Sequence, residues 1–138
     1  MKWRVDFMRV MIDTNVIISA ILNPQGTPKE AFSKAADFPF QLVLCNYIKD
    51  EVFSVFLRKF PKSLVVAESF FAEISAEMNI VSEFSEHSEA LIRDVKDRPI
   101  LRAAIQANVD ILVTGDKDFL DSGITKPRIM TASEFLYI

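Results

Sequence analysis

Carboxylates are the side chains of this sequence that are best placed to do chemistry. Asp13 directly follows the apolar run Met8–Ile12, and Asp116 follows a second apolar run over residues 110–114. If both runs are parallel strands, their ends meet at one edge of a sheet, where open parallel sheets bind ligands. Asp97 stands where a helix is expected to begin, and this position brings a third carboxylate to the same edge.

Glu51 is expected on the apolar face of a helix over residues 46–60. It follows Ile48 by three residues and precedes Val55 by four, so the helical repeat places its carboxylate among apolar side chains. A carboxylate in such surroundings is costly unless it is paired or bound to a metal ion. Pairing with a buried Arg or Lys is the structural alternative.

Converging carboxylates repel one another, and a divalent cation that prefers oxygen ligands removes the repulsion. We therefore expect Mg²⁺ or Mn²⁺ to be held by a set of acids, namely Asp13, Glu51, Asp97, Asp116 and Asp118. Asp118 is either a direct ligand or a supporting contact. Such a site suits the hydrolysis of phosphodiester bonds. Asn15 and Thr114 neighbour the strand-end acids and are expected to hold ligands or a water by hydrogen bonds.

Each acid also has a purely structural interpretation. Asp13 and Asp97 suit helix N-caps, and Asp116 suits an ordinary turn after Gly115. Asp94, one turn before Asp97, is expected to be solvated. Two further reactive side chains are interpreted as structural or incidental, namely His87 and Cys45.

Composition removes several classes of function. The chain has 138 residues, of which 50% are hydrophobic and 25% charged, with a formal net charge of −3. Three glycines are too few for glycine-rich nucleotide-binding turns, and one cysteine and one histidine exclude disulfide frameworks and Cys/His zinc clusters. The sequence shows neither a membrane-spanning run nor a signal peptide, so we expect a cytoplasmic protein that does not enter membranes.

Short apolar runs alternate with longer stretches of helical period, which predicts an α/β fold. We expect a three-layer α/β/α sandwich with a central, mostly parallel sheet. Strands are expected at Met8–Ile12, Phe40–Cys45, residues 79–81, residues 110–114 and Arg128–Met130. Helices are expected through residues 16–21, from Pro28 to about residue 36, over residues 46–60 with Asn46 as N-cap, from Asp97, and over residues 132–138. Residues 1–7 are expected to be a flexible extension and residues 8–138 a single domain.

A helix over residues 64–78 is apolar around most of its circumference. This pattern suggests burial on more than one side, as a core helix or as a surface for self-association. The charges are uneven as well. Residues 66–98 are strongly acidic, and basic residues form two small clusters, which are Arg58, Lys59 and Lys62, and Lys117, Lys126 and Arg128. A nucleic-acid partner usually requires a basic face, and ordinary solvated charge is the alternative interpretation.

Taken together, these residues resemble the PIN domain family, and specifically the single-domain PIN toxins of prokaryotic toxin–antitoxin pairs. The matching segments are residues 11–16, Glu51 with the helix that follows it, residues 94–104 and residues 113–120, in the order found in the family. The resemblance implies a Rossmann-like fold and an Mg²⁺- or Mn²⁺-dependent ribonuclease. Its acidic cluster would be Asp13, Glu51, Asp97 and Asp116, and its supporting residues Asn15, Thr114 and Asp118.

The resemblance also implies partners. PIN toxins form homodimers, and a small antitoxin holds them inactive by reaching the acidic site. The helix over residues 64–78 is a candidate contact surface for either partner.

Two other functions compete with a nuclease. A non-catalytic RNA-binding or protein-interaction module would share the fold, but it has no physical need for four mutually repelling carboxylates. A phosphotransfer domain would need further acids, either a pair after the first strand or a second Asp two residues after the first. Ile12 and Asn15 occupy those places.

Overall fold

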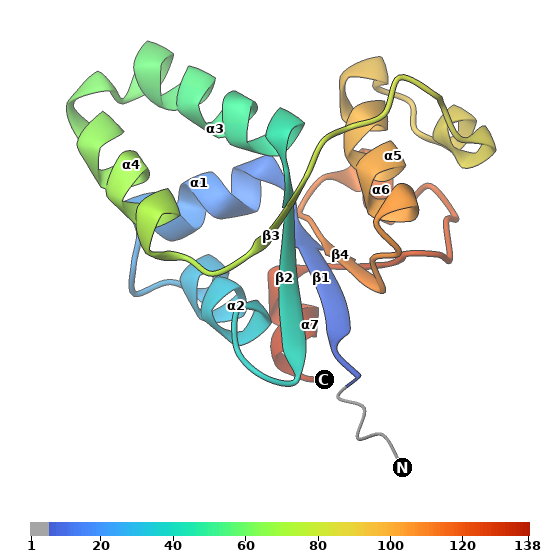
Figure 1. The fold of residues 1–138 in the computed structure, drawn as a ribbon, viewed down its shortest axis with the longest axis horizontal. Coiled ribbons are helices and arrows are strands. Elements are labelled where there is room, and N and C mark those ends of the chain that lie inside the picture. The colour runs from blue at the N-terminus through green and yellow to red at the C-terminus, as the bar shows by residue number, and fades with distance from the viewer. Residues whose placement is uncertain (1–5) are drawn as a thin grey trace.

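The computed structural model describes residues 6–138, and its strands form one sheet in the order β3-β2-β1-β4-β5 (Figure 1). Every neighbouring pair in this sheet is parallel. The strands are β1 (Met8–Ile12), β2 (Phe40–Cys45), β3 (Glu77–Asn79), β4 (Ile111–Val113) and β5 (Arg128–Met130). The expected α/β class with a parallel central sheet is therefore confirmed.

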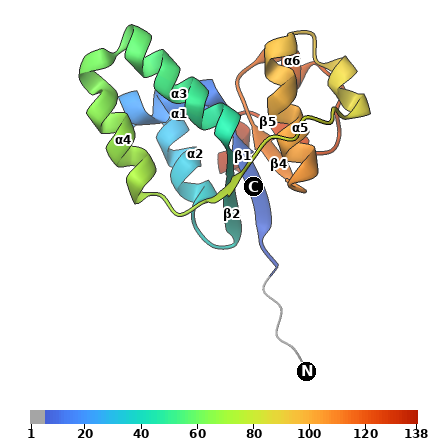
Figure 2. The same cartoon turned by 45° about the horizontal axis from the view of Figure 1, so that its top comes forward.

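Helices cover both faces of the sheet. They are α1 (Thr14–Leu22), α2 (Thr27–Ala35), α3 (Asn46–Lys59), α4 (Leu64–Glu73), α5 (Arg98–Gln106), α6 (Lys117–Leu120) and α7 (Ala132–Leu136), with 3₁₀ turns η1 (Pro61–Ser63), η2 (His87–Leu91) and η3 (Val95–Asp97). The first four helices lie on one side of the sheet, and α5 and α6 lie on the other (Figures 1 and 2). The result is the expected three-layer sandwich.

The strand order reverses beside β1. In the sheet, β2 and β3 follow on one side of β1. The chain then crosses to the other face, and β4 pairs with the opposite edge of β1. Ile12 pairs with Val113, and the Asp13 amide donates to the Val113 carbonyl at 2.9 Å. A reversal of this kind leaves an opening at the carboxyl ends of the two strands, where α/β proteins bind ligands.

The central strands are apolar throughout because both faces of the sheet are covered. Residues 10–12, 42–45 and 111–113 are all buried, and aromatic side chains fill the layers beside them, the largest being Phe56, Phe119 and Phe135. Cys45 is buried among them, as expected of a structural cysteine. This packing fixes the ends of β1 and β4, and therefore the backbone that carries the acids.

Two expectations for the middle of the chain are wrong. The helix expected to reach Met78 ends at Glu73, and β3 lies two residues earlier than expected, because Glu77 pairs with Val43 of β2 and its carboxylate binds the Arg9 guanidinium. The apolar repeat continued through Ile74 and Met78, which concealed the end of the helix.

Of the two interpretations of α4, the core helix is wrong, whereas the surface for self-association stays a prediction. Only Ala67 of this helix is fully buried, and the side chain of Val65 is 70% exposed. Asn46 is the first residue of α3 rather than its N-cap, and its side-chain oxygen accepts from the Val81 amide at 2.9 Å. This hydrogen bond ties the start of α3 to the segment that leaves β3.

The flexible extension expected over residues 1–7 falls mostly outside the described residues. Phe7, which is described, packs edge-to-face against Phe38 with ring centroids 5.8 Å apart. Within residues 6–138, no helix combines the length and the apolar character that crossing a bilayer requires.

An ion pair anchors the long segment between β3 and α5. Glu89 of η2 is 4% exposed, and its carboxylate accepts from Arg102 of α5 at 2.8 and 3.1 Å. Arg102 also donates to the Ser82 carbonyl at 2.9 Å, and Arg98 donates to the Ile92 carbonyl at 3.0 Å. These contacts fasten the segment to α5 on both sides of η2, just before the chain reaches Asp94 and Asp97. Figure 2 shows this segment passing from the α4 side to the α5 side.

We expect Glu89→Met to destabilise the fold by roughly 2–4 kcal/mol, because it leaves Arg102 partly buried without its counter-charge. Arg102→Met should cost about as much, and the double variant should cost clearly less than the sum of the two. Urea unfolding of the four proteins measures this coupling. The matched control is the more exposed Arg9–Glu77 pair, which should couple by less than about 1 kcal/mol. Equal coupling in the two pairs would contradict the anchoring role of Glu89.

Candidate active site

Asp13 and Asp116 are joined through the hydroxyl of Thr114. Asp13 is 4% exposed, and its carboxylate accepts from the Thr14 amide at 2.7 Å and from Thr114 Oγ1 at 2.8 Å. Thr114 Oγ1 in turn accepts from the Asp116 amide at 3.0 Å. The hydroxyl therefore fixes the carboxylate at the end of β1 relative to the backbone after β4. Thr114 therefore positions the Asp13 carboxylate in this structure, and its expected role of holding ligands or a water stays a prediction.

Four of the expected acids surround one cavity of about 370 Å³, and they are Asp13, Glu51, Asp97 and Asp116. They arrive from different elements, since β1 and β4 end here, α3 carries Glu51, and η3 ends at Asp97. Glu51 is half-buried, and it takes part in none of the ion pairs found among the described residues. The alternative that Glu51 is paired with a buried Arg or Lys is thus not what the structure shows.

The structural interpretation of Asp97 as a helix cap does not hold, because Asp94 provides the side-chain cap in this segment. Asp97 stands at the N-cap position of α5, yet it makes no side-chain cap there with any described residue. Asp94 caps η3 instead, accepting from the Lys96 amide at 3.0 Å. The Asp97 carboxylate is therefore available to the cavity, whereas those of Asp13 and Asp116 both line the cavity and cap the helices that follow them.

Burial and mutual repulsion raise the pKa values of two acids. Burial raises the pKa of Asp13 to about 6, and the negative charges of Glu51 and Asp116 add to the effect. Burial also raises the pKa of Asp97 to about 7, assisted by a hydrogen bond shared with Asp116 and by the charges of Asp116 and Asp13. Without a counter-ion, the cluster therefore holds protons at a pH where isolated carboxyl groups have lost them.

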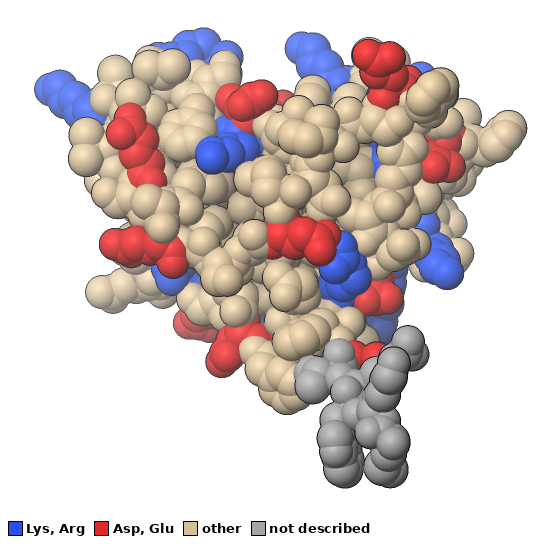
Figure 3. All heavy atoms as spheres, viewed as in Figure 1, with Lys and Arg blue, Asp and Glu red and all other residues tan. Residues whose placement is uncertain are grey.

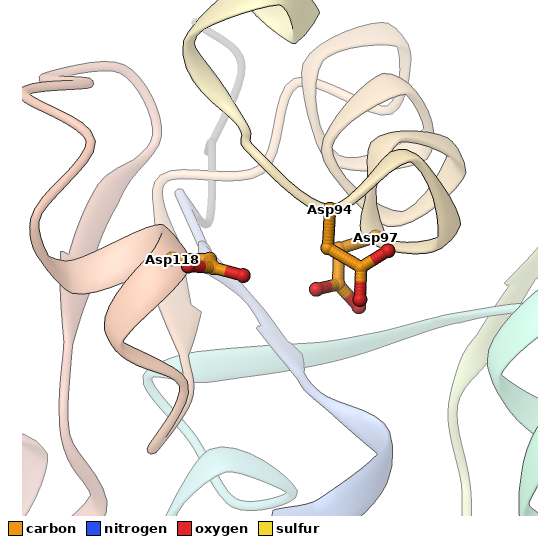
Figure 4. Close-up of side chains that lie close together, drawn as sticks. All are labelled: Asp94, Asp97 and Asp118. Atoms are coloured by element: carbon orange, nitrogen blue, oxygen red, sulfur yellow. The ribbon is translucent and has the colours of Figure 1, made fainter.

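Asp118 lies beside this cavity rather than in its wall. Its carboxylate is paired with Arg93 at 3.0 Å, and Asp94, Asp97 and Asp118 each offer an oxygen atom within 4.8 Å of the others. Figure 4 shows Asp118 pointing from α6 towards the two acids that precede α5. Asp94 is exposed, as expected, but its place in this group was not expected.

Two residues at the site escaped the sequence analysis. Thr14 is buried and lines the cavity, and its hydroxyl has no hydrogen-bond partner among the described atoms. Tyr47 of α3 donates its hydroxyl to the Lys96 carbonyl at 2.6 Å, which ties α3 to η3 beside Asp97. Tyr47 lies one helical turn before Glu51 in α3, but this spacing does not indicate its long-range contact with Lys96.

The donor set fits a hard divalent cation. The cavity is lined by four carboxylates, all of them oxygen donors. Burial and the neighbouring negative charges raise the pKa values of Asp13 and Asp97, and a bound cation would stabilise their ionised forms. The softer ligand types lie elsewhere, since Cys45 is buried in the core and His87 lines a different cavity. Mg²⁺ and Mn²⁺ are the ions that prefer such oxygen donors.

Comparison with known proteins places the chain in a family. The sequence model of the PIN domain matches residues 9–118, a range that contains all of the acids named above. The chain belongs to the PIN domain family. Members of this family are generally nucleases. A curated protein of Methanocaldococcus jannaschii, named uncharacterized protein MJ1680, is 29% identical to this PIN domain over 124 residues, which cover 82% of this chain and 74% of that protein.

Solved structures share the fold of this PIN domain. One chain of VapBC2 from Rickettsia felis, solved bound to a DNA fragment from their promoter, matches with a TM-score of 0.67 and 18% identity, covering 89% of this chain and 97% of that chain. One chain of VapBC-1 from nontypeable Haemophilus influenzae matches with a TM-score of 0.60 and 18% identity, covering 91% of this chain and 99% of that chain. The Rossmann-like PIN fold is thereby confirmed.

Asp13→Asn should stabilise the metal-free protein at pH 8 by roughly 2–3 kcal/mol, because it removes a charge whose burial is unfavourable. The pKa of Asp13 is higher in the folded chain than in the unfolded one. The contribution of Asp13 to the free energy of unfolding of the wild type is therefore fully present below about pH 4, and it is lost as the pH rises through about 6. Urea unfolding in the presence of a chelator should therefore show that the free energy of unfolding of the variant, relative to that of the wild type, increases from pH 4 to pH 8. A gap that does not change with pH would contradict the raised pKa.

Proposed function

We propose that this PIN domain is an Mg²⁺- or Mn²⁺-dependent endoribonuclease and the toxin of a toxin–antitoxin pair in the cytoplasm. The observation that carries the nuclease proposal is the meeting of Asp13, Glu51, Asp97 and Asp116 around one cavity at the reversal of strand order. Membership of a family of nucleases and the resemblance to PIN toxins support it. The fold shared with VapBC chains supports the toxin assignment.

These four acids would hold the cation, with Asp118 beside them as a further ligand or a supporting contact. When bound, the cation supplies a water activated for attack and positive charge against the phosphate. Thr114 keeps the Asp13 carboxylate oriented, because the Thr114 hydroxyl is its donor at 2.8 Å. Thr14 lines the cavity, but its hydroxyl oxygen is buried, so no contact with the substrate is assigned to it. Asn15 is exposed at the rim, where its amide can contact the substrate backbone.

Purified protein should cleave single-stranded RNA with Mg²⁺ or Mn²⁺, and a chelator should stop the reaction. Asp13→Asn and Asp116→Asn should each lower the rate more than about 100-fold, since each removes a proposed ligand rather than a supporting contact. Asp50→Asn is the matched control, because Asp50 is an exposed acid next to Glu51 in the same helix. Cleavage by Asp13→Asn at the wild-type rate would point to another site or another protein. Metal binding without cleavage would favour the non-catalytic module.

The exposed apolar side of α3 and α4 is proposed as the contact surface between two copies of the chain. Leu57 of α3 is 60% exposed, and Val65 and Val66 of α4 are 70% and 53% exposed. A large contiguous apolar patch marks a contact site, and these side chains are proposed to form one. The antitoxin is a separate proposal, tested by whether a small protein encoded beside this gene inhibits RNA cleavage.

Light scattering should give the molar mass of two chains for the wild type and of one chain for the Val65→Ser/Val66→Ser double variant. The expected weakening arises because both side chains would lose their apolar partner surface. Ile80→Ser is the control, because Ile80 is 77% exposed but lies beyond β3. A wild-type protein that is a monomer at all concentrations would refute the dimer proposal.

A further inference from the structure

Two grooves meet at the acidic cluster. The first, called here the α3 groove, is the cavity of about 370 Å³ lined by the four acids and by Arg58, Lys59 and Lys96. The second, called here the α6 groove, has a volume of about 600 Å³ and is lined by residues that include Ser19, Arg93, Lys117 and Asp118. Asn15 and Asp116 line both grooves. A polymer that passes from one groove to the other therefore passes Asn15 and Asp116.

Three positively charged side chains line the α3 groove. Arg58 and Lys59 come from the last turn of α3 and Lys96 from η3, and all three side chains are exposed. None of them belongs to an ion pair within residues 6–138. Their charges are therefore available to an anionic ligand that enters along α3.

The α6 groove carries two more cations. Lys117 is exposed at the start of α6 and is likewise in no ion pair of the described part of the chain. Arg93 is paired with Asp118, but its side chain is 89% exposed, so a phosphate could reach the guanidinium from the open side. The second basic cluster of the sequence is thus divided, because Lys117 lines this groove and Lys126 lines a separate cavity with His87 and Pro127.

The arrangement of charge favours a single strand over a duplex. On the face drawn in Figure 3, Lys and Arg form small separate groups rather than one broad basic surface. A duplex presents two charged backbones and is held mostly through its phosphates, so it calls for a wider basic face. A single strand can follow two narrow grooves with cations on either side of a bend.

We propose that single-stranded RNA runs through both grooves, with the phosphate to be cleaved beside Asp116 and Asn15. Phosphates on one side of it contact Arg58, Lys59 and Lys96, and phosphates on the other side contact Lys117 and Arg93. This proposal rests on the proposed ribonuclease function and specifies how that site takes its substrate. It assigns each group of cations to one flank of the cleaved bond, so cleavage requires nucleotides on both sides.

The test pairs side-chain variants with trimmed substrates. The probe is a single-stranded oligoribonucleotide with one cleavage site, selected from a random-sequence pool with the wild-type protein and then shortened from either end. Arg58→Gln/Lys59→Gln removes charge from the α3 groove, and Arg93→Gln/Lys117→Gln removes charge from the α6 groove. Each double variant should lower kcat/KM about tenfold on the full-length probe. It should also reduce the slope of log(kcat/KM) against log[salt] by about 0.7 for each phosphate that the removed cations neutralised.

Trimming distinguishes the two flanks. The penalty of the α3-groove variant should vanish when one end of the probe is removed, and the penalty of the α6-groove variant should vanish only when the opposite end is removed. Lys126→Gln is the control for loss of one positive charge outside both grooves, and it should cleave like the wild type. Equal melting temperatures of all variants should show that folding is intact.

Several results would overturn the proposed path of the RNA through the two grooves. Variants that cleave every probe as Lys126→Gln does would show that the grooves do not bind RNA. Penalties that vanish on trimming the same end would show that both groups of cations contact one flank. Variants that cleave normally but lose inhibition by a protein partner would assign the grooves to that partner. A wild-type protein that cleaves no RNA would remove the ribonuclease proposal itself, which is a different outcome from unaffected variants of an active enzyme.

Discussion

Repulsion among four carboxylates is the constraint that the surrounding structure has to overcome. Like charges separate unless the backbone that carries them is held in place. Burial raises the pKa values of Asp13 and Asp97, and the charges of the neighbouring acids raise them further. Parallel pairing of Ile12 with Val113 brings two of them together. The hydroxyl of Thr114 then offers one carboxylate a donor that does not depend on solvent.

The other two carboxylates depend on longer connections. Glu51 is placed by α3, which the buried side chains of Val52 and Phe56 seat against the rest of the protein. Asp97 lies at the end of a long segment, which the Glu89–Arg102 pair fastens to α5 and the Tyr47 hydroxyl fastens to α3. The ribbon in Figure 1 shows why both fastenings are needed, since α3 and α5 stand on opposite sides of the sheet. The acids of the site are thus held by contacts made far from them in the sequence.

The sequence predicted those parts of the molecule whose physical cause is local. Strands β1, β2 and β5 were located at their observed bounds, because short apolar runs between turn residues mark them. The four acids were found because strand ends and the apolar face of α3 can be identified by counting residues. The end of α4 and the bounds of β3 were missed, since β3 is a partly exposed edge strand without apolar alternation. Periodicity also could not tell an apolar helix in the core from one that faces outward, as α4 does.

Long-range pairs were equally out of reach. Nothing near Glu89 indicates Arg102, and nothing near Lys96 indicates Tyr47, because each pair forms only after the segments have packed. Net charge was misleading for a related reason. Some acids of the region over residues 66–98 are neutralised by arginines elsewhere, as Glu77 is by Arg9, so the total says little about the charge near any one groove.

The order of the strands also has a consequence during synthesis. Strands β1 and β4 are neighbours in the sheet, but Asp13 and Asp116, which follow them, are 103 positions apart in the sequence. The acidic cluster therefore cannot form until both strands have been synthesised. A nascent or truncated polypeptide that ends before Ile111 lacks the strand that completes the acidic cluster. If the folded protein cleaves RNA, polypeptides of this shorter length lack Asp116 and cannot assemble that site.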